Sequence, residues 1–207
     1  MRQSAPPSGP RNARVGINAP LPVGTGAAIK HIEPGTTDGN AMPPALARFI
    51  ATFAHLGRLP LAPGTWGSAG AIPLAWLLHM AGGFPLLAAA TVVLFLLGWR
   101  ATAIVIDESE DKDPSEVVVD EVVGQWIALF PLSAGLWHAG VDPVIFPWPG
   151  WVGGFVTFRL FDIWKPWPVG WADRRGTALG VMLDDVLAGL WAALLVGIAG
   201  ALAHGMI

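Results

Sequence analysis

The stretch FRLFDIWKPWP, residues 158–168, places an arginine, an aspartate and a lysine at intervals of three residues among apolar neighbours. On a helix, Arg159 and Lys165 lie one turn on either side of Asp162 and form a single stripe, and Pro166 ends the helix. A guanidinium offers a bidentate fork to a phosphate, an ammonium offers a point charge, and the aspartate can bind a metal ion. The stripe therefore predicts a site for phosphate and metal. A ladder of ion pairs on an exposed helix end is the alternative.

Four more carboxylates occur as two adjacent pairs at the edges of apolar segments. Asp120 and Glu121 come just before one segment, and Asp184 and Asp185 just before the last. The helix dipole favours acids at helix starts, so each alone is more often a cap than a ligand. That explanation does not cover Asp162, which falls at an expected helix end. Five acids on three segments favour Mg²⁺, which takes hard oxygen ligands and leaves positions for water and substrate phosphate.

The segment APGTWGSAG, residues 62–70, is a second candidate for phosphate binding. Pro63 and Gly64 are expected to form a turn, and Thr65 or Ser68 to cap the helix that follows. Free backbone N–H groups at such a helix start can hold an anion. A capped turn that leads into an apolar helix needs no ligand, so this segment gains weight only through its expected position beside the acids.

The composition of the chain is typical of a membrane protein. Of its 207 residues, 53% are hydrophobic and 13% are charged, and the mean hydropathy is +0.54. Cysteine is absent, which excludes disulfides, thiolate metal ligands and a cysteine nucleophile. Residues 1–44 differ from the rest, because they are rich in Pro, Gly, Ser and Thr and show no apolar period. They are expected to form a disordered basic tail.

The expected fold is an all-α polytopic membrane bundle over residues 45–207, because crossing the hydrocarbon core takes about 20 apolar residues. A short helix at the membrane interface is expected over residues 45–56. Residues 68–81 contain Pro73 and form either a tilted span or a re-entrant element. The other four expected spans are residues 84–106, 122–139, 144–164 and 186–204.

The distribution of charge predicts how this bundle is oriented. If the five segments cross in turn, every Lys and Arg lies on or near the side from which the first segment starts. The positive-inside rule makes that side the cytoplasm. The acids gather at the same surface, where they repel one another unless water or a cation compensates them.

Four motifs in this order, APGTWGS, VVVDEVVGQW, FRLFDIWKPWP and MLDDVLAG, resemble the phosphatidylglycerophosphatase A family of bacterial membrane phosphatases over residues 45–200. The resemblance implies a helical, Mg²⁺-dependent enzyme of the bacterial cytoplasmic membrane, with its active site facing the cytoplasm. It also implies hydrolysis of the terminal phosphate of phosphatidylglycerophosphate, a lipid, to phosphatidylglycerol and phosphate. No nucleic-acid partner is expected, and the sequence does not indicate the oligomeric state.

The family's motif positions can be carried onto this chain residue by residue, with roles that overlap. The positions implied for phosphate binding are Thr65, Ser68, Arg159 and Lys165. The positions implied for metal binding are Asp120, Glu121, Asp162, Asp184 and Asp185. The positions implied for catalysis are Asp120, Glu121, Asp162, Arg159 and Asp185.

Two mechanisms stay open at the level of the sequence, with one metal ion or two. Metal-activated water can attack phosphorus while Arg159 neutralises the phosphate oxygens, or Asp120 or Asp162 can form an aspartyl-phosphate. Two other protein classes also gather acids on membrane helices. A CDP-alcohol phosphotransferase needs a long spaced Asp-Gly-Ala-Arg signature that is absent here. A transporter or proton relay needs acids along a path, and none falls in the middle of a segment.

Overall fold

The computed structural model describes residues 42–109, 111 and 114–205, and the predicted tail over residues 1–44 lies almost wholly outside them. Within the described residues every regular element is helical and no strand occurs, which confirms the all-α prediction. The α-helices are α1 (Pro44–Ala51), α2 (Pro63–Glu108), α3 (Val119–Ala128), α4 (Phe130–His138), α5 (Trp148–Trp164), α6 (Val169–Asp173) and α7 (Ala178–Ala203), and a 3₁₀ turn covers Leu56–Arg58.

Two of these helices, α2 and α7, are long and apolar enough to cross a membrane, judged by length and composition. The five spans and the interfacial position of the first helix stay predictions. That first helix is shorter than expected, because α1 ends at Ala51 and the three residues 53–55 have positive φ.

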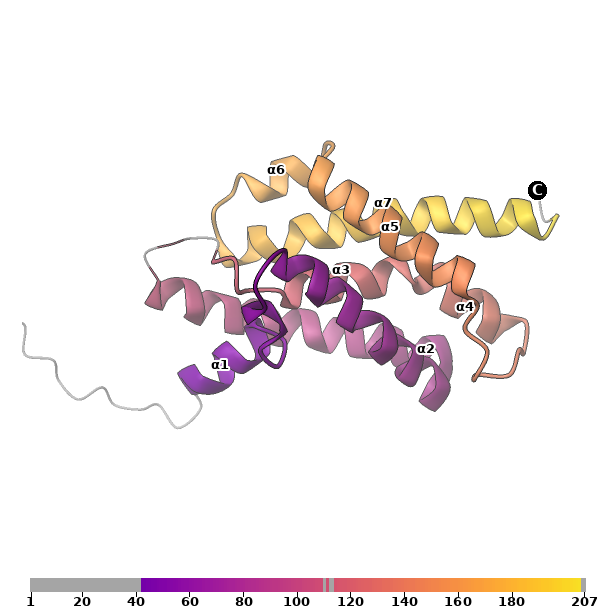
Figure 1. Ribbon diagram of the computed structural model, residues 1–207, viewed down its shortest axis with the longest axis horizontal. Coiled ribbons are helices and arrows are strands. Elements are labelled where there is room, and N and C mark those ends of the chain that lie inside the picture. The colour runs from indigo at the N-terminus through magenta and orange to yellow at the C-terminus, as the bar shows by residue number, and fades with distance from the viewer. Residues whose placement is uncertain (1–41, 110, 112–113, 206–207) are drawn as a thin grey trace, which may run out of the picture. The chain divides into compact units, whose positions relative to one another are not determined.

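Helix α2 is a hairpin rather than one straight helix. Gly82 and Gly83 have non-helical backbone angles, and Gly83 has a φ of +64°, which favours glycine. Near the two ends of α2, Gly67 and Gly98 both pack against the start of α3, so the chain turns back between them (Figure 1). The turn separates the two apolar segments that the sequence predicted on either side of residues 82 and 83.

The segment predicted as one span over residues 122–139 consists of two successive helices. Helix α3 ends at Ala128 and α4 begins at Phe130, with Leu129 between them at φ −88° and ψ −5°. Pro131 has no N–H to donate, so the helical hydrogen-bond ladder is interrupted there. Helix α3 begins at Val119, which puts Asp120 and Glu121 in its first turn, as predicted.

The last helix begins eight residues earlier than the predicted residue 186. Thr177 caps α7, because its hydroxyl oxygen accepts a hydrogen bond from the backbone N–H of Gly180 at 3.1 Å. Asp184 and Asp185 therefore lie past the first turn of α7, and the prediction that they begin the helix is wrong. Since the dipole effect fades within the first turn, helix capping does not explain these two acids.

Helices α3 and α7 touch through their backbones. A Cβ atom added at Gly189 would lie 2.4 Å from the carbonyl oxygen of Gly124, and one at Gly124 would lie 2.6 Å from the carbonyl oxygen of Asp185. Two glycines facing each other thus allow an approach that any side chain would prevent. This contact brings the first turn of α3 beside the acids of α7.

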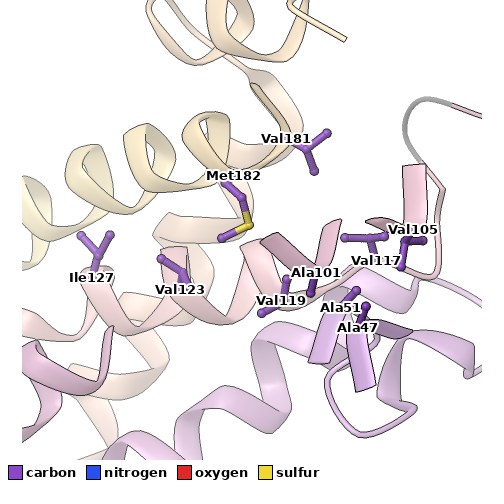
Figure 2. Packing of buried hydrophobic residues seen from close by; sticks show 10 residues of the cluster. All are labelled: Ala47, Ala51, Ala101, Val105, Val117, Val119, Val123, Ile127, Val181 and Met182. Carbon is purple, nitrogen blue, oxygen red and sulfur yellow. The ribbon is translucent and has the colours of Figure 1, made fainter. Parts of the chain in front are cut away.

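Small and branched side chains pack α1, the second half of α2, α3 and α7 together next to this contact (Figure 2). The cluster holds α3 between α2 and α7. The position of the acids therefore depends on the packing of apolar side chains. Its buried members are Ala47, Ala51, Ala101, Val105, Val117, Val119, Val123, Ile127, Val181 and Met182.

Candidate active site

The starts of α2, α3 and α7 and the end of α5 meet at one end of the helical bundle, away from the C-terminal end of α7 (Figure 1). A cavity of about 220 Å³ lies there. The prediction that the acids of three segments gather at one place is confirmed, because all five line this cavity together with the lysine of α5. These residues are Asp120, Glu121, Asp162, Lys165, Asp184 and Asp185.

Three of the acids lie close enough to share one cation. Asp120, Glu121 and Asp185 each offer a carboxylate oxygen within 4.8 Å of the other two. Asp120 and Asp185 are buried, at 7% and 3% exposed, and Glu121 is half-buried. Oε2 of Glu121 and Oδ1 of Asp185 are buried without a hydrogen-bond partner. Because a buried carboxylate oxygen without a partner is costly, this donor set fits a hard divalent cation.

The surroundings of Asp120 and Glu121 disfavour the ionised forms of these two acids. Both precede the segment expected to span a membrane. Burial and then the neighbouring Glu121 raise the pKa of Asp120 well above its usual value. Burial raises the pKa of Glu121 to about 8, although its hydrogen bond with Asp120 acts in the opposite direction. A bound cation would favour the ionised forms of both groups.

Asp184 lies in the cavity but outside this close group of three. Its carboxylate accepts a hydrogen bond from the backbone N–H of Asp185 at 3.0 Å and one from the Lys165 ammonium at 2.9 Å. Its negative charge is thus already paired. A role for Asp184 in metal binding stays a prediction, and the structure gives it a cationic partner that the sequence did not indicate.

The predicted stripe on α5 is divided between two sets of partners. Arg159 Nη1 lies 2.6 Å from Asp162 Oδ2, and these side chains are only 17% and 14% exposed, unlike an ion pair on an open helix end. Arg159 Nη1 also donates a long hydrogen bond of 3.5 Å to Ser68 Oγ. Arg159 Nε is buried without a hydrogen-bond partner, and Arg159 is not among the residues that line the cavity. Lys165 turns away from the stripe.

Lys165 is the C-cap of α5 and has a left-handed backbone, with φ 48° and ψ 54°. Its ammonium forms ion pairs with Asp184 and with Asp173. Burial alone lowers the pKa of Lys165, but the hydrogen bonds with Asp173 and Asp184 outweigh burial and raise the pKa above its usual range. Lys165 is therefore a permanent cation at the cavity. The sequence reasoning missed Asp173, whose only signal was its place eight residues after Lys165.

The start of α2 differs from the expected capped turn. Leu61 and Ala62 have positive φ, and the helix begins at Pro63 without a side-chain cap. Ser68 is buried, and its hydroxyl donates to the carbonyl oxygen of Gly64 at 2.8 Å. Thr65 does not line the cavity, and its backbone N–H donates to Ala62 at 2.9 Å. The predicted capping by Thr65 or Ser68 is therefore wrong, while phosphate binding by either stays a prediction.

Gly64 brings the start of α2 into contact with the acids. A Cβ atom at this position would lie 2.1 Å from Glu121 Oε1 and 3.2 Å from Arg159 Nη1. Any larger residue would push these two side chains away. The sequence suggested Gly64 as a turn residue, but its role is to leave room for a carboxylate.

Comparison with known proteins identifies relatives of this chain. The family model described as phosphatidylglycerophosphatase A matches residues 49–200. The chain is 34% identical to a phosphatidylglycerophosphatase A of Escherichia coli (65% of this chain, 72% of the relative) and 32% identical to one of Haemophilus influenzae (68% and 80%). It is 35% identical to a Bacteroides thetaiotaomicron protein provisionally named phosphatidylinositol-3-phosphatase (76% and 95%). No solved structure matches the chain.

Proposed function

Because the chain belongs to the phosphatidylglycerophosphatase A family, we propose that it hydrolyses phosphatidylglycerophosphate to phosphatidylglycerol and inorganic phosphate with the help of Mg²⁺. The family makes the chain a lipid phosphatase, that is, a hydrolase of phosphoric monoesters. The observation that carries the proposal is the grouping of Asp120, Glu121 and Asp185 within 4.8 Å of one another, in a cavity that Lys165 also lines.

The donors of this group suit Mg²⁺ better than a softer metal. All three are carboxylates, and the described residues around the cavity include no histidine. When bound, the ion would supply Lewis-acid polarisation of the phosphoryl oxygens and compensate the charge of the acids. Asp120, Glu121 and Asp185 would hold it, and two of their oxygens are buried without a partner.

The chain's own cations can bind the phosphate. Arg159 lies one helical turn from Asp162 of the cavity, and only its Nη1 is held, by Asp162 and Ser68, so its other N–H groups would be the donors to a phosphate. Lys165 adds a second positive charge at the cavity. When a dianionic phosphate monoester lies between these groups, their fixed charges would replace part of the hydration of the phosphate. Such fixed charges stabilise the transition state most strongly.

The carboxylates have two possible roles in the chemical step. In the first, one of them accepts the proton of a water that attacks phosphorus, while the bond between phosphorus and the glycerol oxygen breaks and that oxygen takes up a proton. In the second, Asp120 or Asp162 attacks phosphorus and displaces the glycerol oxygen, which takes up a proton, and water then hydrolyses the acyl phosphate to the carboxylate and inorganic phosphate. A substrate made chiral at phosphorus separates them, because one displacement inverts the configuration and two displacements retain it.

Phosphate release from the purified protein tests the proposed reaction. Mixed micelles with phosphatidylglycerophosphate are compared with micelles that contain phosphatidylinositol 3-phosphate, since the names of the relatives point to both lipids. We expect a higher kcat/KM for phosphatidylglycerophosphate. Faster hydrolysis of the inositol lipid would mean that this lipid is the preferred substrate, and the assignment as a lipid phosphatase would stand. A transporter or a phosphotransferase would release no phosphate from either lipid.

Chelation gives the prediction for the metal. Activity should vanish in EDTA and return when Mg²⁺ is added in excess, because the three acids lose the charge that compensates them. N-ethylmaleimide should have no effect, since the chain contains no cysteine. Mg²⁺ should also raise the thermal unfolding midpoint of the purified protein, which can be read without substrate. Full activity after thorough chelation would contradict the proposed dependence on Mg²⁺.

The proposed setting is the bacterial cytoplasmic membrane, with the cavity facing the cytoplasm. The α2 hairpin would cross twice, and residues 122–139, α5 and α7 would cross once each, which would leave the C-terminus outside. A reporter fused after Ile207 should therefore be active only as an external reporter. A reporter placed after Arg175, between α6 and α7, should be active only as a cytoplasmic reporter. The reverse result at Ile207 would show that one of the five segments does not cross.

A further inference from the structure

Helix α6 contacts Lys165 at two separate points. Its carboxyl-terminal residue, Asp173, forms an ion pair with the Lys165 ammonium. In its first turn, a Cβ atom at Gly170 would lie 2.8 Å from the carbonyl oxygen of Lys165. The helix thus packs directly on the backbone of Lys165 and holds the end of its side chain. Helix α6 also packs against α7, because Val169 lies in a buried apolar cluster with Phe158 and Ala188, and a Cβ atom at Gly180 would lie 2.9 Å from the carbonyl oxygen of Ala172.

The two acids that bind Lys165 lie in different surroundings. Asp184 lines the cavity and its side chain is 9% exposed, whereas Asp173 does not line the cavity and its side chain is 36% exposed. Asp184 draws the ammonium toward the other acids, and Asp173 draws it outward. Without Asp173, the lysine would neutralise Asp184 and be less available to an incoming anion.

We infer that Asp173 is a positioning residue for Lys165, which holds the ammonium at the mouth of the cavity so that it binds the phosphate of the substrate. The inference deepens the proposed function and rests on it. It assigns no contact with substrate to Asp173. In this inference α6 keeps the Lys165 ammonium shared between Asp184, which lines the cavity, and Asp173, which does not.

The substitution Asp173→Asn tests this role. The lysine contact is made with the phosphate of the bound substrate and of the transition state alike, so its loss should raise KM and leave kcat within about twofold. The inhibition constant of inorganic phosphate should rise by the same factor as KM, about 2- to 5-fold, as for a partly exposed ion pair. A purely structural role would lower the unfolding midpoint and the active fraction, and would change neither KM nor the inhibition constant.

Three further variants make the result specific. Asp173→Glu keeps the carboxylate and should restore part of the lost affinity. Lys165→Met removes the cation, and Asp173→Asn should then cause no additional rise in the inhibition constant. Glu108→Gln breaks the exposed ion pair with Arg48 at 3.0 Å, outside the residues that line the cavity, and should leave all constants unchanged.

The possible outcomes separate the inference from the proposed function. Unchanged KM and inhibition constant in Asp173→Asn would overturn the inference, and so would an equal rise in the Lys165→Met background. If Asp173→Asn does not fold, Asp173→Ser, which also removes the carboxylate, is measured by the same criteria. If wild-type protein releases no phosphate from lipid, the proposed function fails. Calorimetric binding of inorganic phosphate to wild type and Asp173→Asn, in the presence of Mg²⁺, then decides the role of Asp173.

Discussion

Replacing Asp185 by asparagine should lower kcat by roughly 10²- to 10⁴-fold and leave the helical bundle folded. The side chain of Asp185 is 3% exposed, belongs to the group of three close carboxylates and has an oxygen without a partner. Asparagine has nearly the same shape but lacks the negative charge that a divalent cation needs. Because the substitution also removes repulsion among the acids, the thermal unfolding midpoint should stay the same or rise.

The measurement is kcat for micellar phosphatidylglycerophosphate at saturating Mg²⁺, together with thermal unfolding with and without Mg²⁺. In the variant, the shift of the unfolding midpoint by Mg²⁺ should become smaller. Asp142→Asn is the matched control, since this acid lies between α4 and α5 and accepts a hydrogen bond from Val144 N at 3.0 Å. Turnover near that of wild type in Asp185→Asn would mean that the close acids have a structural role only.

The second large effect is expected from Asp162→Asn, again roughly 10²- to 10⁴-fold in kcat. An ion pair on an exposed helix end contributes only about 0.3 to 0.5 kcal/mol, and its loss would have little effect. The pair of Asp162 with Arg159 is different, because its N–O distance is 2.6 Å and both side chains are less than one fifth exposed. Removing this acid would release the guanidinium and also take one carboxylate from the cavity.

Arg159→Lys provides the companion measurement on the other side of the pair. It should also reduce turnover strongly, because an ammonium keeps the charge but loses the planar fork that binds Asp162 and a phosphate together. Thermal unfolding of both variants is recorded beside kcat. Near wild-type turnover in Asp162→Asn would mean that Asp162 and Arg159 form a local ion pair with no role in catalysis. Lost turnover with a much lower unfolding midpoint would assign the pair to stability instead.

Much of the helical order was readable from the sequence, because long apolar segments separated by glycine, proline and charge are a strong signal. The turn at Gly82 and Gly83 is one example. The start of α7 was missed, because its first turns carry Asp184 and Asp185 and a hydropathy pattern excludes charged residues from a span. The cap at Thr177 shows where the helix begins, but a single threonine in a loop is too common to be used alone.

The candidate site was predictable in its members but not in its pairings. The five acids could be placed at one end of the bundle because they lie at the ends of neighbouring segments. The partners of Lys165 could not be predicted. Its left-handed backbone turns the side chain out of the stripe that a regular helix would form. The contact of Gly64 with Glu121 depends on how closely two helices approach, and no local pattern records that distance.

The backbone contact between Gly124 and Gly189 sets a condition for anyone who wishes to transplant this site into a designed scaffold. Copying the acids onto two helices at an ordinary spacing of 8 to 10 Å would change the separation of their carboxylates from the one that this crossing gives. The unit to be copied is the crossing itself, with both glycines, because it sets the separation of the two acidic turns. The loop that ends in α6 must be kept as well, and so must the segment before α3, because Pro114, Ser115 and Val117 line the cavity.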